Sequence, residues 1–145
     1  MKRAKRLQPV GQLMNELERE SALRVAGAQT RLAEAQRRCS ELQTYLDEYR
    51  ARFDQRAKAG MGVSGMRDYQ TFIARLSEAV QAQQAVVETL SAECQREREV
   101  WFQAAARKSA VGKVIAKAQS EDRTAEDRRI QREADERAQR QRGAL

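Results

Sequence analysis

The sequence predicts an all-α fold, a long two-helix antiparallel coiled-coil hairpin. Ala, Arg, Gln, Glu and Leu dominate the 145 residues, whereas there are only 3 Phe, 3 Tyr, 1 Trp and 1 Pro. This composition is typical of long helices and supplies too few bulky residues for a thick globular core. Apolar residues recur every three or four positions on both sides of one glycine-rich segment, and that period indicates coiled-coil helices. Because the segment is short, the two helices should be antiparallel neighbours.

The first helix is expected at residues 7–58. Two successive steps of four, from Leu17 through Ser21 to Val25, predict a stutter that locally unwinds a supercoil. The complete apolar stripe comprises Leu7, Val10, Met14, Leu17, Ser21 as a polar member, Val25, Ala28, Leu32, Ala35, Cys39, Leu42, Leu46, Tyr49 and Phe53.

The turn is expected at residues 59–65 and the second helix at residues 66–118. Gly60 suits the left-handed cap of the first helix, and Lys58 suits its negative end. The second stripe keeps a strict three-four spacing through Met66, Tyr69, Ile73, Leu76, Val80, Gln83, Val87, Leu90, Cys94, Glu97, Trp101, Ala104, Lys108, Val111, Ile115 and Ala118.

When the two helices fold back about this turn, two residues lie opposite each other if their numbers sum to roughly 122; we call this the pairing rule. Phe53 should then meet Tyr69, whereas Cys39 and Cys94 should be offset by roughly 16 Å along the axis, too far for a disulfide. The coiled coil is expected to span residues 1–118. Residues 119–145 hold 7 Arg and 7 acidic side chains, and we expect a charged helical extension or a disordered tail there.

No catalytic, cofactor-binding or metal site is expected. The chain has no His and only 2 Cys, far apart in the sequence, so the common general base and zinc ligands are missing. Residues 60–65 read Gly-Met-Gly-Val-Ser-Gly, but a dinucleotide-binding loop needs a βαβ unit around it. No apolar run is long enough to span a membrane and no signal peptide is evident, so a cytosolic location is expected.

The formal net charge of +7 favours acidic partners. Four basic residues open the chain, and four more lie between Val100 and Ser120, where there is no acid. The pairing rule brings these two groups to the same end of the hairpin, which predicts docking onto an acidic surface; an ordinary solvated face is the alternative. No aromatic side chains interleave with these charges for base stacking, so no specific nucleic acid is expected. The eight are Lys2, Arg3, Lys5, Arg6, Arg107, Lys108, Lys113 and Lys117.

Arg-Leu-Gln-Pro-Val occupies residues 6–10, and Tyr-Leu-Asp-Glu-Tyr-Arg occupies residues 45–50. These motifs resemble the FliJ family of the bacterial flagellar export apparatus: the first is similar to the family's opening, and the second matches its Tyr-x-x-Glu-Tyr-Arg element. Asp-Tyr-Gln-Thr-Phe-Ile at residues 68–73 resembles its Asn-Tyr-Gln-x-Phe-Ile element, with Asp68 in place of the usual Asn. Trp101 lies where the family often has a tryptophan.

The resemblance implies a non-enzymatic stalk of flagellar type III protein export, similar to the gamma subunit of rotary ATP synthases and required for motility and chemotaxis. The implied location is the cytoplasm, peripheral at the inner membrane below the flagellum. Three partners are implied: the hexameric ring of the export ATPase FliI, whose assembly the stalk promotes; the export gate protein FlhA; and export chaperones, which the stalk recycles.

The same resemblance implies which residues contact the partners. The eight basic residues listed above are expected to contact the ATPase. In the family, the positions that match Phe72 and Leu76 serve the FlhA contact, and the expected gate surface comprises Tyr69, Gln70, Phe72, Ile73 and Leu76. Phe72 flanks the stripe, so it could instead widen the core beside the turn. Two other functions stay open: a generic coiled-coil adaptor or chaperone, such as the stalk of an injectisome, and a basic nucleic-acid-binding protein.

Overall fold

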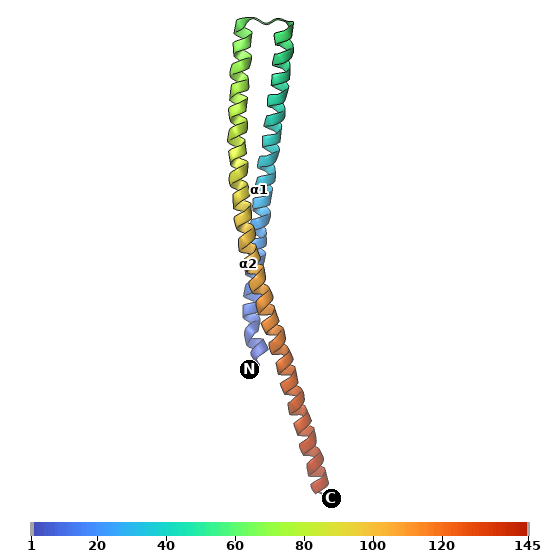
Figure 1. Cartoon of the computed structure of the whole chain (residues 1–145). Helices are drawn as coiled ribbons and strands as arrows, with labels where there is room; N and C mark the ends of the chain where they lie inside the picture. The colour runs from blue at the N-terminus through green and yellow to red at the C-terminus, as the bar shows by residue number, and fades with distance from the viewer. Residues whose placement is uncertain (1, 145) are drawn as a thin grey trace. The chain divides into compact units, whose positions relative to one another are not determined.

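The computed structural model describes residues 2–144 as two long helices and one short connection (Figure 1). Helix α1 comprises Arg3–Ala59 and helix α2 comprises Val63–Gly143. No strand occurs among residues 2–144. The two helices run antiparallel and pack against each other, which confirms the predicted all-α helical hairpin.

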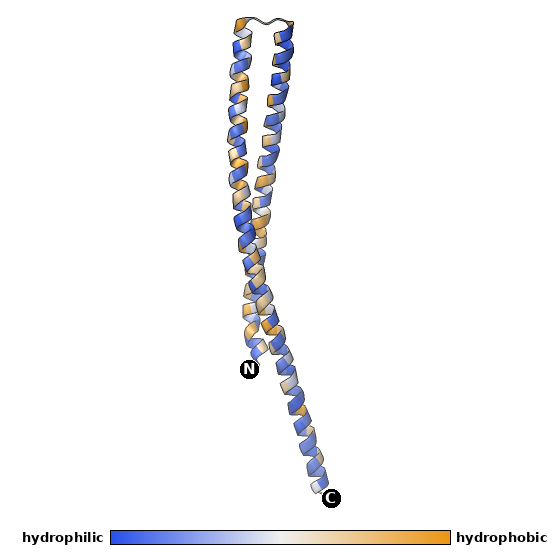
Figure 2. Ribbon diagram, viewed as in Figure 1, coloured by the Kyte–Doolittle hydropathy of each residue, from blue (hydrophilic) through white to orange (hydrophobic). Residues whose placement is uncertain are grey.

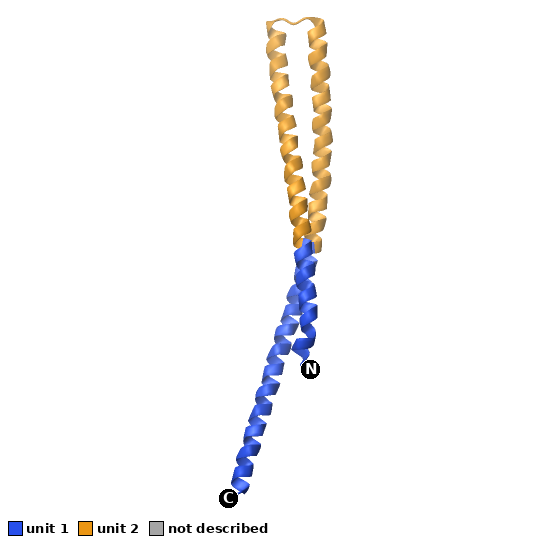
Figure 3. Cartoon of the chain, turned by 180° about the vertical axis from the view of Figure 1, so that it is seen from behind, with its two compact units in different colours: residues 1–21, 101–145 blue, residues 22–100 orange. Residues whose placement is uncertain are grey.

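The chain divides into two compact units, coloured separately in Figure 3. Unit 1 contains residues 1–21 and 101–145, and unit 2 contains residues 22–100. In each unit, a segment of α1 packs against a segment of α2, so each has its own part of the seam between the helices. None of the described helices carries an apolar stretch long enough to cross a membrane.

Both helices extend beyond the ranges expected from the sequence. Helix α1 begins at Arg3 rather than residue 7 and includes Pro9, whose missing N–H removes one intrahelical hydrogen bond. The connection covers residues 60–62 rather than 59–65, and α2 continues to Gly143 rather than residue 118. A division between a coiled coil and a charged extension at residue 118 stays a prediction.

The connection depends on one glycine. Gly60 has a φ of 99°, a conformation that costs other residues free energy because their Cβ meets the backbone. Its N–H donates to the Ala57 carbonyl over 3.4 Å, and the basic residues Arg56 and Lys58 lie in the last turn of α1. The Met66 N–H then donates to the Gly62 carbonyl over 3.0 Å, which closes the first turn of α2. Gly60 therefore ends α1 as the sequence predicts.

The seam of unit 2 follows the predicted register. Leu46 and Val80 are 2% and 4% exposed, and the rings of Phe53 and Tyr69 lie 6.0 Å apart, as the pairing rule predicts. The other buried members are Ala28, Ala35 and Cys94. Gln83 is the predicted polar member, and its side-chain amide donates to the Ala35 carbonyl over 3.1 Å. This bond offsets the cost of placing an amide in an apolar seam.

The seam of unit 1 corrects the predicted register of α1. Val10 and Leu17 are 41% and 40% exposed, and Gly11 and Glu18 take the seam positions instead. The three-four spacing is then unbroken up to the buried Ser21, so the predicted stutter is wrong. The prediction followed side-chain hydrophobicity, whereas packing at these two positions requires a small residue and a satisfied polar one.

Two contacts explain why Gly11 and Glu18 occupy the seam. A Cβ on Gly11 would lie 2.8 Å from Cδ1 of Ile115, so glycine leaves room for that side chain. The indole N–H of Trp101 donates to the Glu18 carboxylate over 3.0 Å. Lys108 Nζ lies 3.7 Å from the other carboxylate oxygen. A charged group in a seam is tolerated when it is paired in this way.

The segment of α2 beyond Gln119 is strongly hydrophilic in Figure 2. Arg129 pairs with Glu126 one turn earlier and with Glu133 one turn later, the latter over 2.7 Å. The hydrogen bond from Arg129 lowers the pKa of Glu126 below its ordinary value. Such pairs one turn apart support an exposed helix.

A leucine pair in α1 tests where the stability of the seam comes from. Leu46→Ala should lower the free energy of unfolding by about 2–4 kcal/mol, because a buried leucine leaves a cavity. Leu23, which is 69% exposed, provides the matched control. Leu23→Ala should change the free energy of unfolding by less than about 0.5 kcal/mol. Urea unfolding followed by circular dichroism measures both values, and equal effects would contradict this assignment of the seam.

Candidate partner-binding surfaces

All eight basic residues predicted to contact the ATPase lie in unit 1 and are exposed. Two of them are engaged in ion pairs across the seam: Arg3 with Glu121 at 3.8 Å and Lys108 with Glu18 at 3.7 Å. The other six make no ion pair within residues 2–144: Lys2, Lys5, Arg6, Arg107, Lys113 and Lys117. Their charges are therefore available to a partner.

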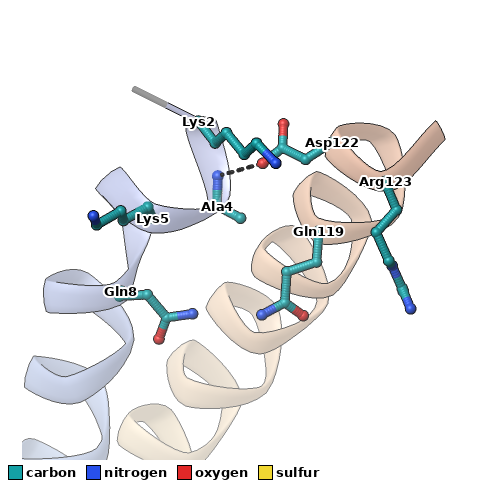
Figure 4. Close-up of a pocket in the computed structure, with 7 residues that line it drawn as sticks. All are labelled: Lys2, Ala4, Lys5, Gln8, Gln119, Asp122 and Arg123. Carbon is teal, nitrogen blue, oxygen red and sulfur yellow. Dashed lines mark hydrogen bonds between the residues drawn. The ribbon is translucent and has the colours of Figure 1, made fainter. Parts of the chain in front are cut away.

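An acidic side chain holds the start of α1 against α2. The first turn of α1 contains no acid, and the Ala4 N–H donates to Oδ2 of Asp122 over 3.2 Å (Figure 4). This carboxylate from α2 serves as the N-terminal cap that the first turn lacks. An open cavity of about 510 Å³ lies beside it, lined by Lys2, Ala4, Lys5, Gln8, Gln119, Asp122 and Arg123.

Five aromatic side chains gather in unit 2. The closest rings are those of Tyr49 and Phe72, with centroids 4.5 Å apart, and Tyr45 lies 5.1 Å from Tyr49. Tyr69 joins Tyr49 at 6.4 Å and Phe53 at 6.0 Å. Tyr45 and Phe72 are 46% and 38% exposed, so the cluster reaches from the seam to the surface.

Two arginines cover part of this aromatic cluster. The guanidinium of Arg52 lies 5.3 Å from the centre of the Tyr49 ring, and that of Arg56 lies 5.8 Å from the centre of the Tyr69 ring. Both distances are within the range of cation–π attraction. Hydrogen bonding and charge repulsion from Tyr45 raise the pKa of Tyr49 above its ordinary value, while Arg52 acts in the opposite direction. The Tyr49 phenol is therefore neutral near pH 7.

The structure separates the five predicted gate residues into two groups. Tyr69, Ile73 and Leu76 are half-buried in the seam, whereas Gln70 and Phe72 are exposed. Gln70 and Phe72 are therefore accessible, whereas Tyr69, Ile73 and Leu76 contribute to packing between the helices. This agrees with the place of Phe72 beside the predicted stripe.

Tyr45 and Tyr49 of α1 were not among the predicted contacts, although they lie next to each other and Tyr49 touches Phe72. The signal that could have found them is the spacing of four between the two tyrosines, which places them one turn apart on the same side of a helix. The pairing rule also places Tyr49 close to Phe72, because their numbers sum to nearly 122.

Both surfaces lie within the part of the chain that matches a known protein family. The family model of the flagellar FliJ protein matches residues 2–143. The chain belongs to the FliJ family. It is therefore a component of the flagellar protein export apparatus, and the FliJ family is a non-enzymatic one. No curated protein and no solved structure matches the chain significantly.

Both candidate surfaces belong to the region that identifies the chain as a FliJ-family member. The matched region includes every basic residue of unit 1 and all five aromatic residues of the unit 2 cluster. No group of three or more His, Cys, Asp or Glu side chains suited to a metal ion occurs in the described part of the chain. The described residues of this FliJ-family chain present exposed basic charge in unit 1 and exposed aromatic area in unit 2.

Neighbouring residues of α2 should differ in their importance for folding. Ile73→Ala should cost about 2 kcal/mol of stability because Ile73 lies in the seam. Phe72→Ala should cost roughly 1 kcal/mol, mainly through the lost contact with Tyr49. Thermal unfolding of both variants provides the comparison. A larger loss for Phe72→Ala would show that Phe72 belongs to the core and not to a binding surface.

Proposed function

We propose that this FliJ-family chain is the stalk of the flagellar export ATPase. In this proposal, unit 1 binds an acidic surface inside the hexameric ring of FliI and promotes ring assembly. Unit 2 binds the cytoplasmic domain of the gate protein FlhA. The chain acts without catalysis, as a mechanical and electrostatic link between ATPase and gate.

The observation that carries the proposal is the set of six basic side chains in unit 1 without an ion-pair partner in the described chain. Long-range attraction between such a surface and an acidic ring lining would speed encounter and weaken as salt screens it. A two-helix element is also slim enough, at about 20 Å across, to enter the opening of a ring.

The aromatic cluster of unit 2 supports the proposed gate contact. Exposed aromatic side chains that are held in place by neighbours lose little entropy on binding and dominate many interfaces. Tyr49 fixes the Phe72 ring from one side at 4.5 Å, and Phe72 remains 38% exposed. We include Tyr45 and Tyr49 in this surface together with Gln70 and Phe72.

The remaining parts of the proposal come from the family. The chain is proposed to work in the cytoplasm, peripherally at the inner membrane through the export gate, and to recycle export chaperones. An adaptor role with a different partner is the second candidate, and the experiment below separates the two.

The ATPase rate of the matching FliI, measured with and without the chain, tests the stalk proposal. The chain should stimulate the rate at substoichiometric amounts if it promotes ring assembly. A variant with four exposed basic residues of unit 1 changed to Ala should need roughly tenfold more protein for half-maximal stimulation, because it loses electrostatic steering. These four are Lys5, Arg6, Arg107 and Lys113.

A second quadruple variant controls for net charge. It changes four exposed arginines of unit 2, none of them in an ion pair within residues 2–144, and lowers the formal charge by the same amount: Arg67, Arg75, Arg96 and Arg98. Normal stimulation by this control places the ATPase contact in unit 1. Absence of stimulation by the unaltered chain, with FliI competent to form rings, would refute the stalk and favour the adaptor.

Binding to the purified cytoplasmic domain of FlhA tests the gate contact separately. Phe72→Ala should weaken binding by about tenfold, as loss of an aromatic anchor does at other interfaces. Val86→Ala is the control, because Val86 lies two heptads from Phe72 on the same side of α2 and is 44% exposed. Calorimetric titration gives both affinities. Equal affinities for the two variants would exclude Phe72 from the contact.

A further inference from the structure

Two strips of residues run along one side of unit 1, beside the seam. On α1, Arg6, Val10, Leu13 and Leu17 follow one another at spacings of four, three and four, so they form one line on the helix surface. On α2, Arg107, Ala110, Val114 and Lys117 do the same at spacings of three, four and three.

The ion pair between Arg3 and Glu121 shows that the two strips flank the seam on the same side. Val10 lies seven residues after Arg3, and Val114 lies seven residues before Glu121. Because a coiled-coil helix returns to the same side every seven residues, Val10 and Val114 face that side together.

The centre of this side is apolar and accessible. Val10, Leu13 and Leu17 are 41%, 50% and 40% exposed, and Val114 is 45% exposed. We name these four residues the Val10 face. Basic residues enclose it, since Arg6 and Lys117 lie toward one end and Arg107 toward the other.

Exposed valines also occur in unit 2 at the heptad position of Val114, since Val86 and Val100 are 44% and 46% exposed. No residue of α1 in unit 2 at the heptad position of Val10 is a large aliphatic one; Arg31, for example, bonds to Glu93 across the seam over 3.0 Å. The Val10 face replaces such a pair with valine on both helices. Clustered exposed aliphatic residues within a charged border are typical of a binding site.

We propose that the Val10 face binds an amphipathic helix with acidic ends, which would lie along the seam as a third helix. Its chemistry follows from the face. The apolar centre requires aliphatic anchors at i, i+3 or i+4, and i+7 on the partner, as in other helix-binding surfaces. The basic residues at both ends require acidic residues about three helical turns apart.

Charge complementarity favours this occupant over a second copy of the chain. The three basic residues around the Val10 face, Arg6, Arg107 and Lys117, have no ion-pair partner in residues 2–144, and α2 has no acid between Val100 and Ser120. Two such faces would repel each other. The proposal does not rest on the ATPase or gate contacts, and its test uses neither protein.

The probe is a synthetic helical peptide of about 20 residues, with leucines at the anchor positions and glutamates at both ends. Its binding to the full-length chain is measured by fluorescence anisotropy of a label on the peptide. A matching peptide with lysines in place of the glutamates tests the charge requirement. The expected result is saturable binding of the acidic peptide in the micromolar range and no binding of the basic one.

Variants that keep the charge of the chain locate the contact. Leu13→Gln should weaken peptide binding by about tenfold, through the loss of one apolar anchor. Leu23→Gln is the matched control, because Leu23 lies on the same helix, is 69% exposed and is outside the face. Val114→Gln, on α2, should act like Leu13→Gln. Circular dichroism checks that each variant is folded.

Three outcomes would overturn the proposal. The first is no binding of the acidic peptide to the unaltered chain, and the second is equal binding by Leu13→Gln and Leu23→Gln. The third is binding of the chain to vesicles of anionic lipid that Leu13→Gln abolishes while the peptide fails to bind, which would assign the face to a membrane surface. Weaker binding by both Leu13→Gln and Val114→Gln, with Leu23→Gln unchanged, supports a third helix.

Discussion

In each unit, a seam of side chains holds α1 against α2, since residues 2–144 provide no third layer onto which either helix could fold. Each helix buries one narrow stripe, and most other positions meet water. Small residues such as Ala28, Ala35 and Ala118, all at most 5% exposed, let the helices approach closely. Because a narrow stripe buries little area per residue, a substitution in the seam changes the stability of the helix pair around it.

Polar residues share this seam, most of them with a bonding partner. Gln83 bonds to a backbone carbonyl, and Glu18 is bonded by Trp101 and paired with Lys108. Such positions sacrifice some hydrophobic stabilisation but restrict which residues can lie opposite one another. Ser21 is the exception, because its hydroxyl is buried without a hydrogen-bond partner in the described chain.

Both candidate surfaces exist because the seam brings distant residues together. The basic surface of unit 1 combines the start of α1 with α2 residues more than a hundred positions later. The aromatic cluster of unit 2 combines Tyr49 with Phe72 across the hairpin. Neither helix alone would carry the complete set of contacts.

The sequence was sufficient to predict the hairpin, the register of α2 and the pairing of Phe53 with Tyr69, because these follow from the period of apolar residues and the place of the turn. It was insufficient at Val10 and Leu17. There the more hydrophobic residue lies outside and Gly11 and Glu18 lie inside, and only the neighbours Ile115 and Trp101 reveal why. The pairing of Arg3 and Lys108 with acids on the opposite helix was likewise missed, since side-chain contacts are not encoded in spacing alone.

The unbroken seven-residue repeat restricts how the length of such a chain can change in evolution. Deleting one residue from either helix would rotate all later side chains by about 100° and move the stripe out of the seam. A change of seven residues in one arm would keep each stripe intact but would slide the two arms past each other by about 10 Å. Viable insertions or deletions should therefore occur as matched heptads, one in each arm, at equal distances from Gly60.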